Sequence, residues 1–320
     1  MNTKVLRTKE TSEKSSYRVT NWREYEAALV KRGNVTLWFA EDVVSEQWKP
    51  KATGKRGAPF DYSDMAIQVL LTLKAVFKLT YRGLEGFGHS LMQIMKLELN
   101  IPDHSSLSRR ARKLGVVIPC RIHTEPLHVV MDATGLKVYG EGEWKVRQHG
   151  VSKRRTWIKV HLAVDTAILD IIGVEVTTTE WADAEVFEGL LDQVEGAIEQ
   201  ISLDGAYDTR AVYAAASQRG IRLAVPPRSN AVPWEDGHPR NEAIARIAEQ
   251  GMKHWKKSTN YHQRSLAENA MYRLKQLFGD RLSARLFETQ VTEVHVRIAA
   301  MNIITSLGMP VSVRVGTVAP

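Results

Sequence analysis

The stretch LHVVMD, residues 127–132, marks the point where a basic, helical sequence pattern gives way to alternating strands and helices. A short apolar run that ends in a carboxylate is typical of a buried strand stopping at the edge of a sheet. The same pattern returns as ISLD, residues 201–204. Clefts form where strands of an open sheet end, so Asp132 and Asp204 are candidate metal ligands. A single Asp in such a place is more often a turn or capping residue, and Gly205 favours that interpretation at Asp204.

The segment TWIKVHLAVD, residues 156–165, alternates in a way that predicts a half-buried strand. Its apolar face holds Val160, Leu162 and Val164, and its other face holds Trp157, Lys159 and His161. Further strands are expected at Gly135–Tyr139, Trp144–Gln148 and 222–227, and helices at 183–199, 208–219, 240–250, 261–278 and 286–306. This order predicts a mixed sheet covered by helices, which is an α/β fold. Asp165 also ends a strand and competes with Asp132 for the role of first carboxylate.

The late segment YHQRSLAENAMYRLKQLF, residues 261–278, carries the most specific pattern. At about 100° per residue of an α-helix, four polar side chains share one narrow stripe: Tyr261, Arg264, Glu268 and Lys275. The apolar side chains expected on the opposite, buried side are Leu266, Ala270 and Leu277, with Leu274 on its flank. An exposed i,i+4 ion pair explains Arg264 and Glu268 at a few tenths of a kcal/mol, but it does not explain the alignment of the outer two residues.

Two aspartates at strand ends and one glutamate on a late helix suit a two-metal phosphoryl-transfer site. Two Mg²⁺ ions about 4 Å apart carry four positive charges, which three carboxylates largely neutralise while leaving positions open for substrate oxygens. Arg264 and Lys275, next to the carboxylate of Glu268, would hold the neighbouring phosphates and align the scissile bond. The acidic set is therefore Asp132, Asp204 and Glu268.

The first part of the chain is basic and predicts a polyanion partner. Residues 1–126 hold 21 Lys+Arg and 13 Asp+Glu, whereas the remainder is balanced at 23 of each. Helices are expected near 21–33, 62–78 and 80–98, and Asp103 or Ser105 caps a further one. That last helix carries Arg109, Arg110, Arg112 and Lys113, and with the two helices before it resembles a helix-turn-helix. A solvated charged helix is the simpler alternative.

These residues together resemble the DDE transposases of bacterial insertion sequences, the group with a Y-x2-R-x3-E-x6-K signature. The signature is intact as Tyr261, Arg264, Glu268 and Lys275. VMDATGLKVYG and LDGAYDT are similar to the family's segments around its two aspartates, and RRTWIKVHLAVD to the strand between them. The resemblance covers about 127–307 and the helical segment before it. It implies a ribonuclease H-like core with the first Asp on the first strand, the second just after the fourth, and the Glu on a helix beyond the fifth.

The resemblance also implies the activity. A transposase of this type binds the terminal inverted repeats of its element, cleaves by two-metal hydrolysis and joins the 3′-OH ends to target DNA. It would use two Mg²⁺ ions, with Mn²⁺ as a substitute, and work as a homodimer or larger assembly on paired ends. Tyr261, Arg264 and Lys275 are expected to position DNA phosphates, and Lys153, Arg154 and Arg155 to contact the DNA backbone. The alternatives are a metal-dependent DNA nuclease without strand transfer and a catalytically silent DNA-binding regulator.

Other features of the sequence limit the classes of protein that are possible. No apolar stretch approaches the roughly 20 residues of a membrane span, the start has no secretory pattern, and the lone Cys120 excludes a disulfide framework. We therefore expect a cytoplasmic protein that joins the nucleoid when bound to DNA. Trp255 is more readily a core residue than a base-stacking one, and His149, His161 and His262 are expected to be structural or to contact DNA. The expected divisions are a polar, unstructured start within a basic lead and linker at 1–60, a helical DNA-binding domain at 61–126, a catalytic domain at 127–310 and a tail at 311–320.

Overall fold

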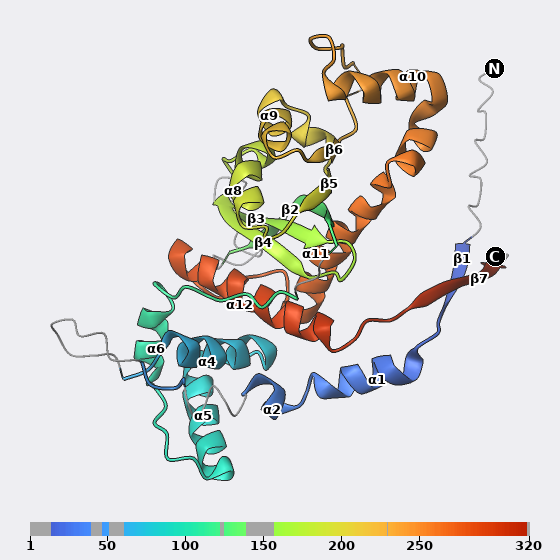
Figure 1. Ribbon diagram of the computed structural model, residues 1–320. Helices are drawn as coiled ribbons and strands as arrows, with labels where there is room; N and C mark the ends of the chain where they lie inside the picture. Colours follow the sequence, from blue (N-terminus) through green and yellow to red (C-terminus); the bar gives the residue numbers. More distant parts are fainter. Residues whose placement is uncertain are drawn as a thin grey trace, which may run out of the picture.

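A five-stranded mixed sheet forms the centre of the fold (Figure 1). The computed structural model describes residues 14–39, 47–50, 61–121, 125–138, 157–228 and 230–318. The strands are β2 (Leu127–Lys137), β3 (Trp157–Asp165), β4 (Ile171–Thr178), β5 (Ile198–Ser202) and β6 (Arg222–Ala224), in the spatial order β4-β3-β2-β5-β6. Neighbours among β2, β3 and β4 pair antiparallel, whereas β5 runs parallel to β2 and to β6. The predicted mixed α/β sheet is confirmed.

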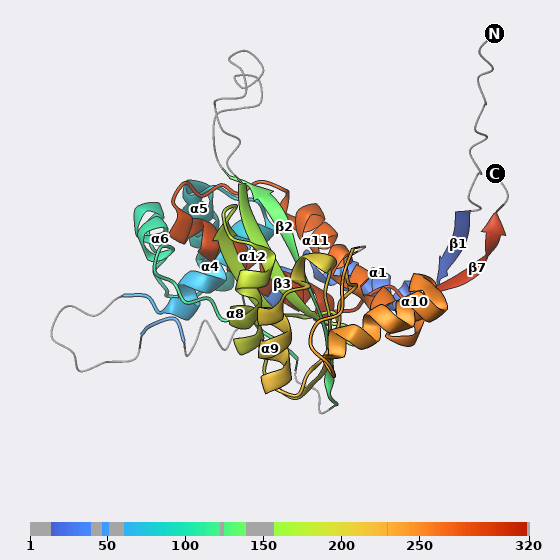
Figure 2. The ribbon, with the colours of Figure 1, turned by 90° about the horizontal axis from the view of Figure 1, so that it is seen from above.

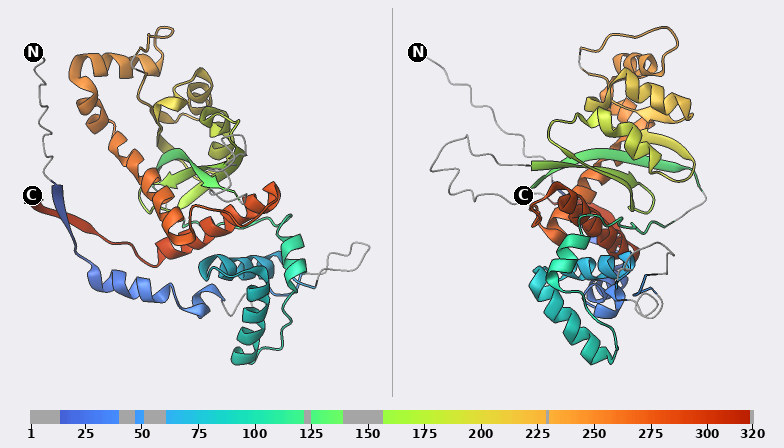
Figure 3. Two further views of the ribbon diagram at one scale, coloured as in Figure 1. Left: turned by 180° about the vertical axis from the view of Figure 1, so that it is seen from behind. Right: turned by 90° about the vertical axis from the view of Figure 1, so that its left-hand side faces the viewer.

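Helices cover both faces of the sheet. Alternate residues of β2 point to opposite faces, so Val130 and Leu136 pack on one side and Val129 and Met131 on the other. The helices over the first face are α11 (Ser265–Phe278) and α12 (Phe287–Ser306), and those over the second are α8 (Phe187–Asp192) and α9 (Arg210–Gln218) (Figure 3). On the second face of β3, His161, Ala163 and Asp165 are buried, whereas Trp157 and Lys159 are partly exposed. The half-buried strand expected at 156–165 is therefore correct only for its first residues, and the strand is buried on both faces from Val160 onward.

Several boundaries differ from the sequence-based expectations. The strand β2 continues through Gly135 to Lys137, so no separate strand begins at residue 135, and Trp144–Gln148 lies outside the described residues. The helix expected over 183–199 is a 3-10 turn, η1 (Asp183–Val186), followed by the short α8. Gly196 has a φ of +101° in the turn that ends this helical stretch and leads into β5. The helix expected near 240–250 is longer, α10 (Pro239–Ser258), with a kink at Gly251.

The N-terminal helices differ from a helix-turn-helix in one connection. They are α1 (Trp22–Lys31), α2 (Val35–Trp38), α4 (Asp64–Val76), α5 (Tyr81–Met95) and α6 (His104–Arg110). The tight turn, residues 77–80, lies between α4 and α5, whereas the longer segment 96–103 joins α5 to α6. Lys96 adopts a left-handed conformation that ends α5, and the apolar residues after it pack on the core. Asp103 is the cap of α6, which ends at Arg110, so Arg112 and Lys113 lie in the turn beyond it.

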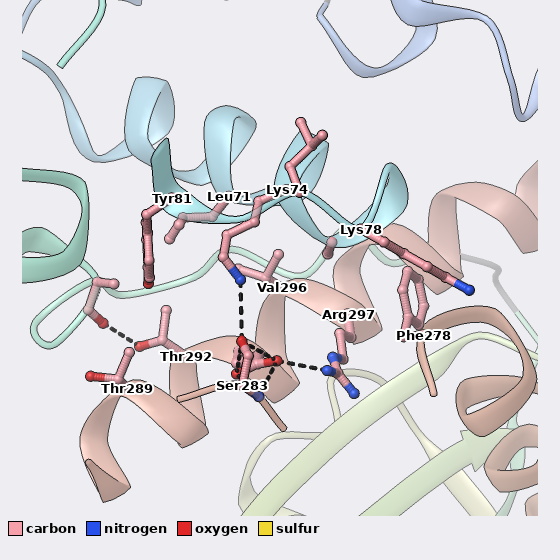
Figure 4. Close-up of a pocket in the computed structure, with 14 residues that line it drawn as sticks. Leu71, Lys74, Lys78, Tyr81, Phe278, Ser283, Thr289, Thr292, Val296 and Arg297 are labelled. Carbon is pink, nitrogen blue, oxygen red and sulfur yellow. Dashed lines mark hydrogen bonds and ion pairs between the residues drawn. The ribbon is translucent and has the colours of Figure 1, made fainter. Parts of the chain in front are cut away.

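One hydrophobic cluster joins the N-terminal helices to the sheet through α12. Buried residues of α4, α12 and the α11 face of the sheet belong to this single cluster, and α4 lies along α12 (Figure 1). Lys74 of α4 donates to Ser283 Oγ at 3.2 Å, and Thr292 Oγ1 of α12 donates to the Ala111 carbonyl at 2.6 Å. Both contacts border a cavity of about 250 Å³ between the two helices (Figure 4). The expected boundary at residue 126 is thus bridged by a shared core.

The two ends of the described chain pair with each other. The strand β1 (Lys14–Val19) is antiparallel to β7 (Ser312–Val318), and the two form a ribbon that stands apart from the body of the molecule (Figure 2). The unstructured start expected before residue 21 is therefore wrong for residues 14–19, and the expected tail at 311–320 contains a strand. Pairing with a strand almost 300 positions away is a long-range event that local composition does not report. No helix among the described residues has the length and apolar character to cross a membrane.

Candidate active site

Two of the predicted acidic residues lie on neighbouring parallel strands. The pair Val130 and Ser202 is the last in register between β2 and β5, and Asp132 and Asp204 each follow it by two residues. Both therefore continue the same face, which is the face that α11 covers. Asp132 retains 16% of its side-chain exposure. Burial raises the pKa of Asp132, the charge of Asp204 raises it further, and a hydrogen bond from the Ala133 N–H opposes both.

Asp204 has a second, local role. Its Oδ1 accepts a hydrogen bond from the Ala206 N–H at 2.8 Å and so caps the 3-10 turn η2 (Gly205–Tyr207). The turn-forming alternative raised by the sequence is thus present in the structure. It leaves the other carboxylate oxygen of Asp204 outside this contact, so capping and a role in the site are compatible.

The signature segment is not one continuous α-helix. Asn260 has a left-handed conformation, η3 (Tyr261–Arg264) is a 3-10 turn, and α11 begins at Ser265. Tyr261 is buried against Trp255, with ring centroids 5.2 Å apart, so the expected single stripe from Tyr261 to Lys275 is wrong at its first residue. The buried side of α11 is also rotated from the expected one, since Leu266 and Leu277 are half-buried. Its buried residues are Ala267, Ala270, Met271, Leu274 and Phe278.

Arg264 joins two of the candidate carboxylates. Its Nη1 donates to Asp132 Oδ2 at 2.7 Å, and its Nη2 donates to Glu268 Oε1 one turn further along the chain. The predicted Arg264–Glu268 pair is thus present, together with a contact to β2 that helical spacing does not reveal. Glu268 keeps 55% of its side-chain exposure, whereas Arg264 keeps 21%. Two N–H groups of one guanidinium therefore link the sheet to the first turn of α11.

Lys275, two turns of α11 beyond Glu268, also contacts β2. Its Nζ donates to Thr134 Oγ1 at 2.7 Å, and Thr134 lies two residues beyond Asp132 on the same face of β2. Arg264 and Lys275 thus line β2 with positive charge on either side of its carboxylate. Thr134 belongs to the VMDATG segment, but nothing in the sequence singled it out as a partner of Lys275.

The donor set has the chemistry of a divalent-cation site. Asp132, Asp204 and Glu268 offer only carboxylate oxygens, which are the ligands that Mg²⁺ and Mn²⁺ prefer. A cation, the guanidinium of Arg264, already lies between two of them. Within the described ranges, no three His, Cys, Asp or Glu side chains converge closely enough to hold a metal as they stand. The chemistry of the donor set thus fits such an ion, and Arg264 occupies oxygens of two of the three acids.

The remaining predicted residues are scattered. Arg109, Arg112 and Lys113 are exposed, whereas Arg110 donates to the Tyr62 carbonyl and to Asp64 at 2.6 Å. Lys153, Arg154, Arg155 and His149 lie outside the described residues.

Three other candidates have clear places in the fold. Trp255 is a core residue, and His262 is exposed. Asp165 lies opposite Val129 because β3 runs antiparallel to β2, and its carboxylate accepts the Ala167 N–H at the far end of the strand. It is therefore not a rival to Asp132.

Two ion pairs escaped sequence reasoning, and one of them is buried. Arg240 forms a bidentate pair with Asp208 at 2.6 and 2.8 Å and lies over the Trp234 ring, which ties α10 to the turn after Asp204. On the α8 face, Lys159 pairs with Asp183 at 2.8 Å beside the buried His161. Each pair joins residues more than 20 positions apart, so spacing in the sequence could not reveal it.

With this geometry established, family models identify the class of protein. One model, described as a transposase DDE domain, matches residues 30–141, and a second with the same description matches residues 123–303. Because the second spans more than half of the chain, the chain belongs to the DDE transposase family. The resemblance found in the sequence is thereby confirmed at the level of the family.

Comparison with solved structures adds distant likenesses. One is to piggyBac transposase in a synaptic complex with hairpin DNA, at 15% identity and a TM-score of 0.43, over 91% of this chain and 77% of that chain. Another is to a simian T-cell lymphotropic virus intasome in complex with PP2A regulatory subunit B56 gamma, at 15% identity and a TM-score of 0.25, over 62% of this chain and 69% of that one. The family assignment rests on the family models and not on these likenesses.

Proposed function

We propose that this DDE transposase cleaves the ends of an insertion sequence of the bacterial Y-R-E-K group and joins the freed 3′-OH ends to target DNA. The observation that carries the proposal is the meeting of Asp132 and Glu268 at Arg264, with Asp204 just past the end of the adjacent parallel strand. Three carboxylates from three separate elements, set beside fixed cations, are what metal-dependent phosphoryl transfer requires. Binding of DNA alone would not call for acidic groups among its phosphate contacts.

Transposases of this family generally use divalent metal ions, and we propose two Mg²⁺ ions held by Asp132, Asp204 and Glu268. When bound, such ions supply Lewis acidity to the attacking and leaving oxygens. The chain's own cations hold the substrate: Arg264 presents a planar fork that matches phosphate, and Lys275 adds a point charge fixed by Thr134. Tyr261, buried against Trp255, supports the turn from which Arg264 projects.

The proposed partner is double-stranded DNA, both the terminal inverted repeats and the target. The N-terminal helices supply exposed cations at Arg109, Arg112 and Lys113 for contact with the DNA backbone, and Lys153, Arg154 and Arg155 are further candidates. Since two element ends are joined in one reaction, the working form is proposed to be a homodimer or larger assembly. We propose that residues 61–126 serve mainly DNA binding and residues 127–310 catalysis, although the two parts share a core.

The test is a cleavage and strand-transfer assay on labelled DNA that carries the element's own ends. Asp132→Asn should still bind that DNA specifically, yet lose activity by on the order of 10³-fold in Mg²⁺ or Mn²⁺, because a neutral amide neither binds nor neutralises a divalent ion well. Asp280→Asn is the matched control, since Asp280 pairs with Lys137 at the end of the same strand and is exposed. The control should keep its activity.

Three outcomes would redirect the assignment. Unimpaired joining by Asp132→Asn would refute the catalytic role of that residue. Cutting by the wild type without joining of a pre-cut end would favour the nuclease alternative. Specific binding without any cutting, in either metal, would favour a DNA-binding regulator.

A further inference from the structure

Arg264 occupies the space between two carboxylates that the proposed function assigns to a metal ion. One N–H of its fork goes to Asp132 on β2 and another to Glu268 on α11, so the guanidinium takes lone pairs from both acids at once. A divalent cation that used the same oxygens would meet a permanent positive charge at contact distance. Arg264 and the metal ion are therefore competitors in this arrangement.

The backbone of Arg264 is firmly held, although its side chain is long. Gln200 of β5 donates to the Thr259 carbonyl at 2.8 Å, and the buried Tyr261 anchors the turn that follows. Glu268, by contrast, lies at the exposed side of α11. Movement of the guanidinium away from the acids thus requires a change in side-chain rotamer, whereas the positions of β2 and α11 stay as they are.

We propose that Arg264 is an exchangeable counter-cation that makes metal binding at this site depend on DNA. Without DNA it neutralises Asp132 and Glu268 and weakens their affinity for divalent ions. A DNA phosphate accepts the same planar fork, draws the guanidinium away and frees the carboxylate oxygens. This inference rests on the proposed function and adds the order in which the ligands bind. Arg264 binds a DNA phosphate first, and only then are the oxygens of Asp132 and Glu268 free to bind the metal ion.

Linkage turns the proposal into a measurable coupling. If DNA relieves the competition, DNA must tighten divalent-ion binding, and the ion must tighten DNA binding by the same factor. Replacing Arg264 with Gln should bring the affinity for Mn²⁺ in the absence of DNA close to the DNA-bound level, a gain of about tenfold. Lys275→Gln is the matched control, since it removes one positive charge from the same helix but breaks a contact with Thr134 and not with a carboxylate.

The experiment titrates Mn²⁺ into the full-length chain and follows free Mn²⁺ by electron paramagnetic resonance, with and without a duplex oligonucleotide. Signal from ions bound elsewhere, including on the DNA, is subtracted with Asp132→Asn under the same conditions. We expect DNA to tighten Mn²⁺ binding by the wild type and by Lys275→Gln, and to have little effect on Arg264→Gln. Equal Mn²⁺ affinities for the wild type and Arg264→Gln without DNA would overturn the proposal.

A charge-conserving variant keeps the test decisive if Arg264→Gln folds poorly by circular dichroism. Arg264→Lys retains one positive charge, but a single ammonium cannot span both acids with the geometry of the fork, so it should also bind Mn²⁺ more tightly than the wild type. The experiment distinguishes failure of the counter-cation role from failure of the proposed metal-dependent function. Binding of Mn²⁺ that depends on Asp132 but not on residue 264 removes only the counter-cation role, whereas no Asp132-dependent binding under any condition removes the proposed metal-dependent function with it.

Discussion

At the scale of single residues, the burial of His161 shows how the sheet limits what a side chain can do. Its Nε2 is 2.9 Å from Thr177 Oγ1, and its Nδ1 lies 3.7 Å from Asp183 without a hydrogen-bond partner among the described residues. Burial lowers the pKa of His161 to about 4, although the charge of Asp183 acts against this and that of Lys159 adds to it. His161 is therefore a neutral structural residue at physiological pH.

This predicts an acid-sensitive contribution to stability. The unfolded chain takes up the proton near the ordinary pKa of about 6.5, whereas the folded chain resists until about pH 4. The contribution is thus fully present above pH 6.5 and is lost as the pH falls towards 4. Between pH 7 and pH 4, the titration of His161 should cost the wild type roughly 3 kcal/mol of its free energy of unfolding. The His161→Gln variant has no titrating group at this position, so it should not show this loss.

Urea unfolding at a series of pH values between 4 and 7 measures the difference. His262→Gln, the same substitution at an exposed position, should follow the wild-type profile. If the wild-type and His161→Gln profiles run parallel, His161 does not stay neutral in the folded protein.

At the scale of elements, α6 separates cations that serve the fold from cations that face solvent. Arg110 is 18% exposed and ties the end of α6 to Asp64 at the start of α4. Arg109, Arg112 and Lys113 are exposed, and the last two lie beyond the end of the helix. The basic cluster that looked uniform along the sequence therefore divides into one structural residue and three surface residues.

The division predicts two kinds of variant. Replacing both Arg109 and Arg112 with Ala should weaken DNA binding at low salt. The slope of log affinity against log salt concentration should also become shallower, by about one for each phosphate contact that is lost. Arg110→Ala should leave that slope unchanged and lower the thermal midpoint, because it removes a partly buried pair and a bond to the Tyr62 carbonyl. Fluorescence anisotropy over a salt series and thermal melts measure the two effects, and a flattened slope for Arg110→Ala alone would contradict the assignment.

At the scale of the whole molecule, the N-terminal helices and the sheet share one hydrophobic core. The cluster that contains Leu70 and Leu73 of α4 also contains Val294 and Met301 of α12 and Val130 of β2. Glu293 accepts from the backbone of Ser283 and Ala284 beside the cavity that α4 closes (Figure 4). Without the N-terminal helices, one side of α12 would be left exposed.

A fragment of residues 125–320 should therefore fold poorly on its own. We expect it to bind a hydrophobic dye and to lose the cooperative heat-absorption peak, because the apolar surface that α4 covers would face water. The full chain should unfold in a single transition. Calorimetry of both proteins checks this, and a fragment that melts cooperatively near the full-length midpoint would show that the catalytic part is an independent domain.

Much of the site could be predicted because its residues sit in short, regular local patterns. LHVVMD and ISLD place Asp132 and Asp204 after buried runs, and helical spacing predicts the Glu268–Arg264 contact. The contact of Arg264 with Asp132 spans 132 positions, and no local pattern reports it. The 3-10 turn at Tyr261 was also missed, since it depends on the left-handed conformation of Asn260.

The sequence by itself determined the family and the mixed α/β character of the fold, and it predicts which acidic and basic residues carry the chemistry, because these depend on residue types at fixed local spacings. Tertiary structure alone decided that β3 is buried on both faces from Val160 onward, that β1 pairs with β7, and that α4 shares a core with α12. It also decided that Arg264 bridges two acids from different elements. The physical reason is that burial, strand pairing and ion pairing are set by which surfaces meet in space, and segments far apart in the chain meet only when the whole chain packs.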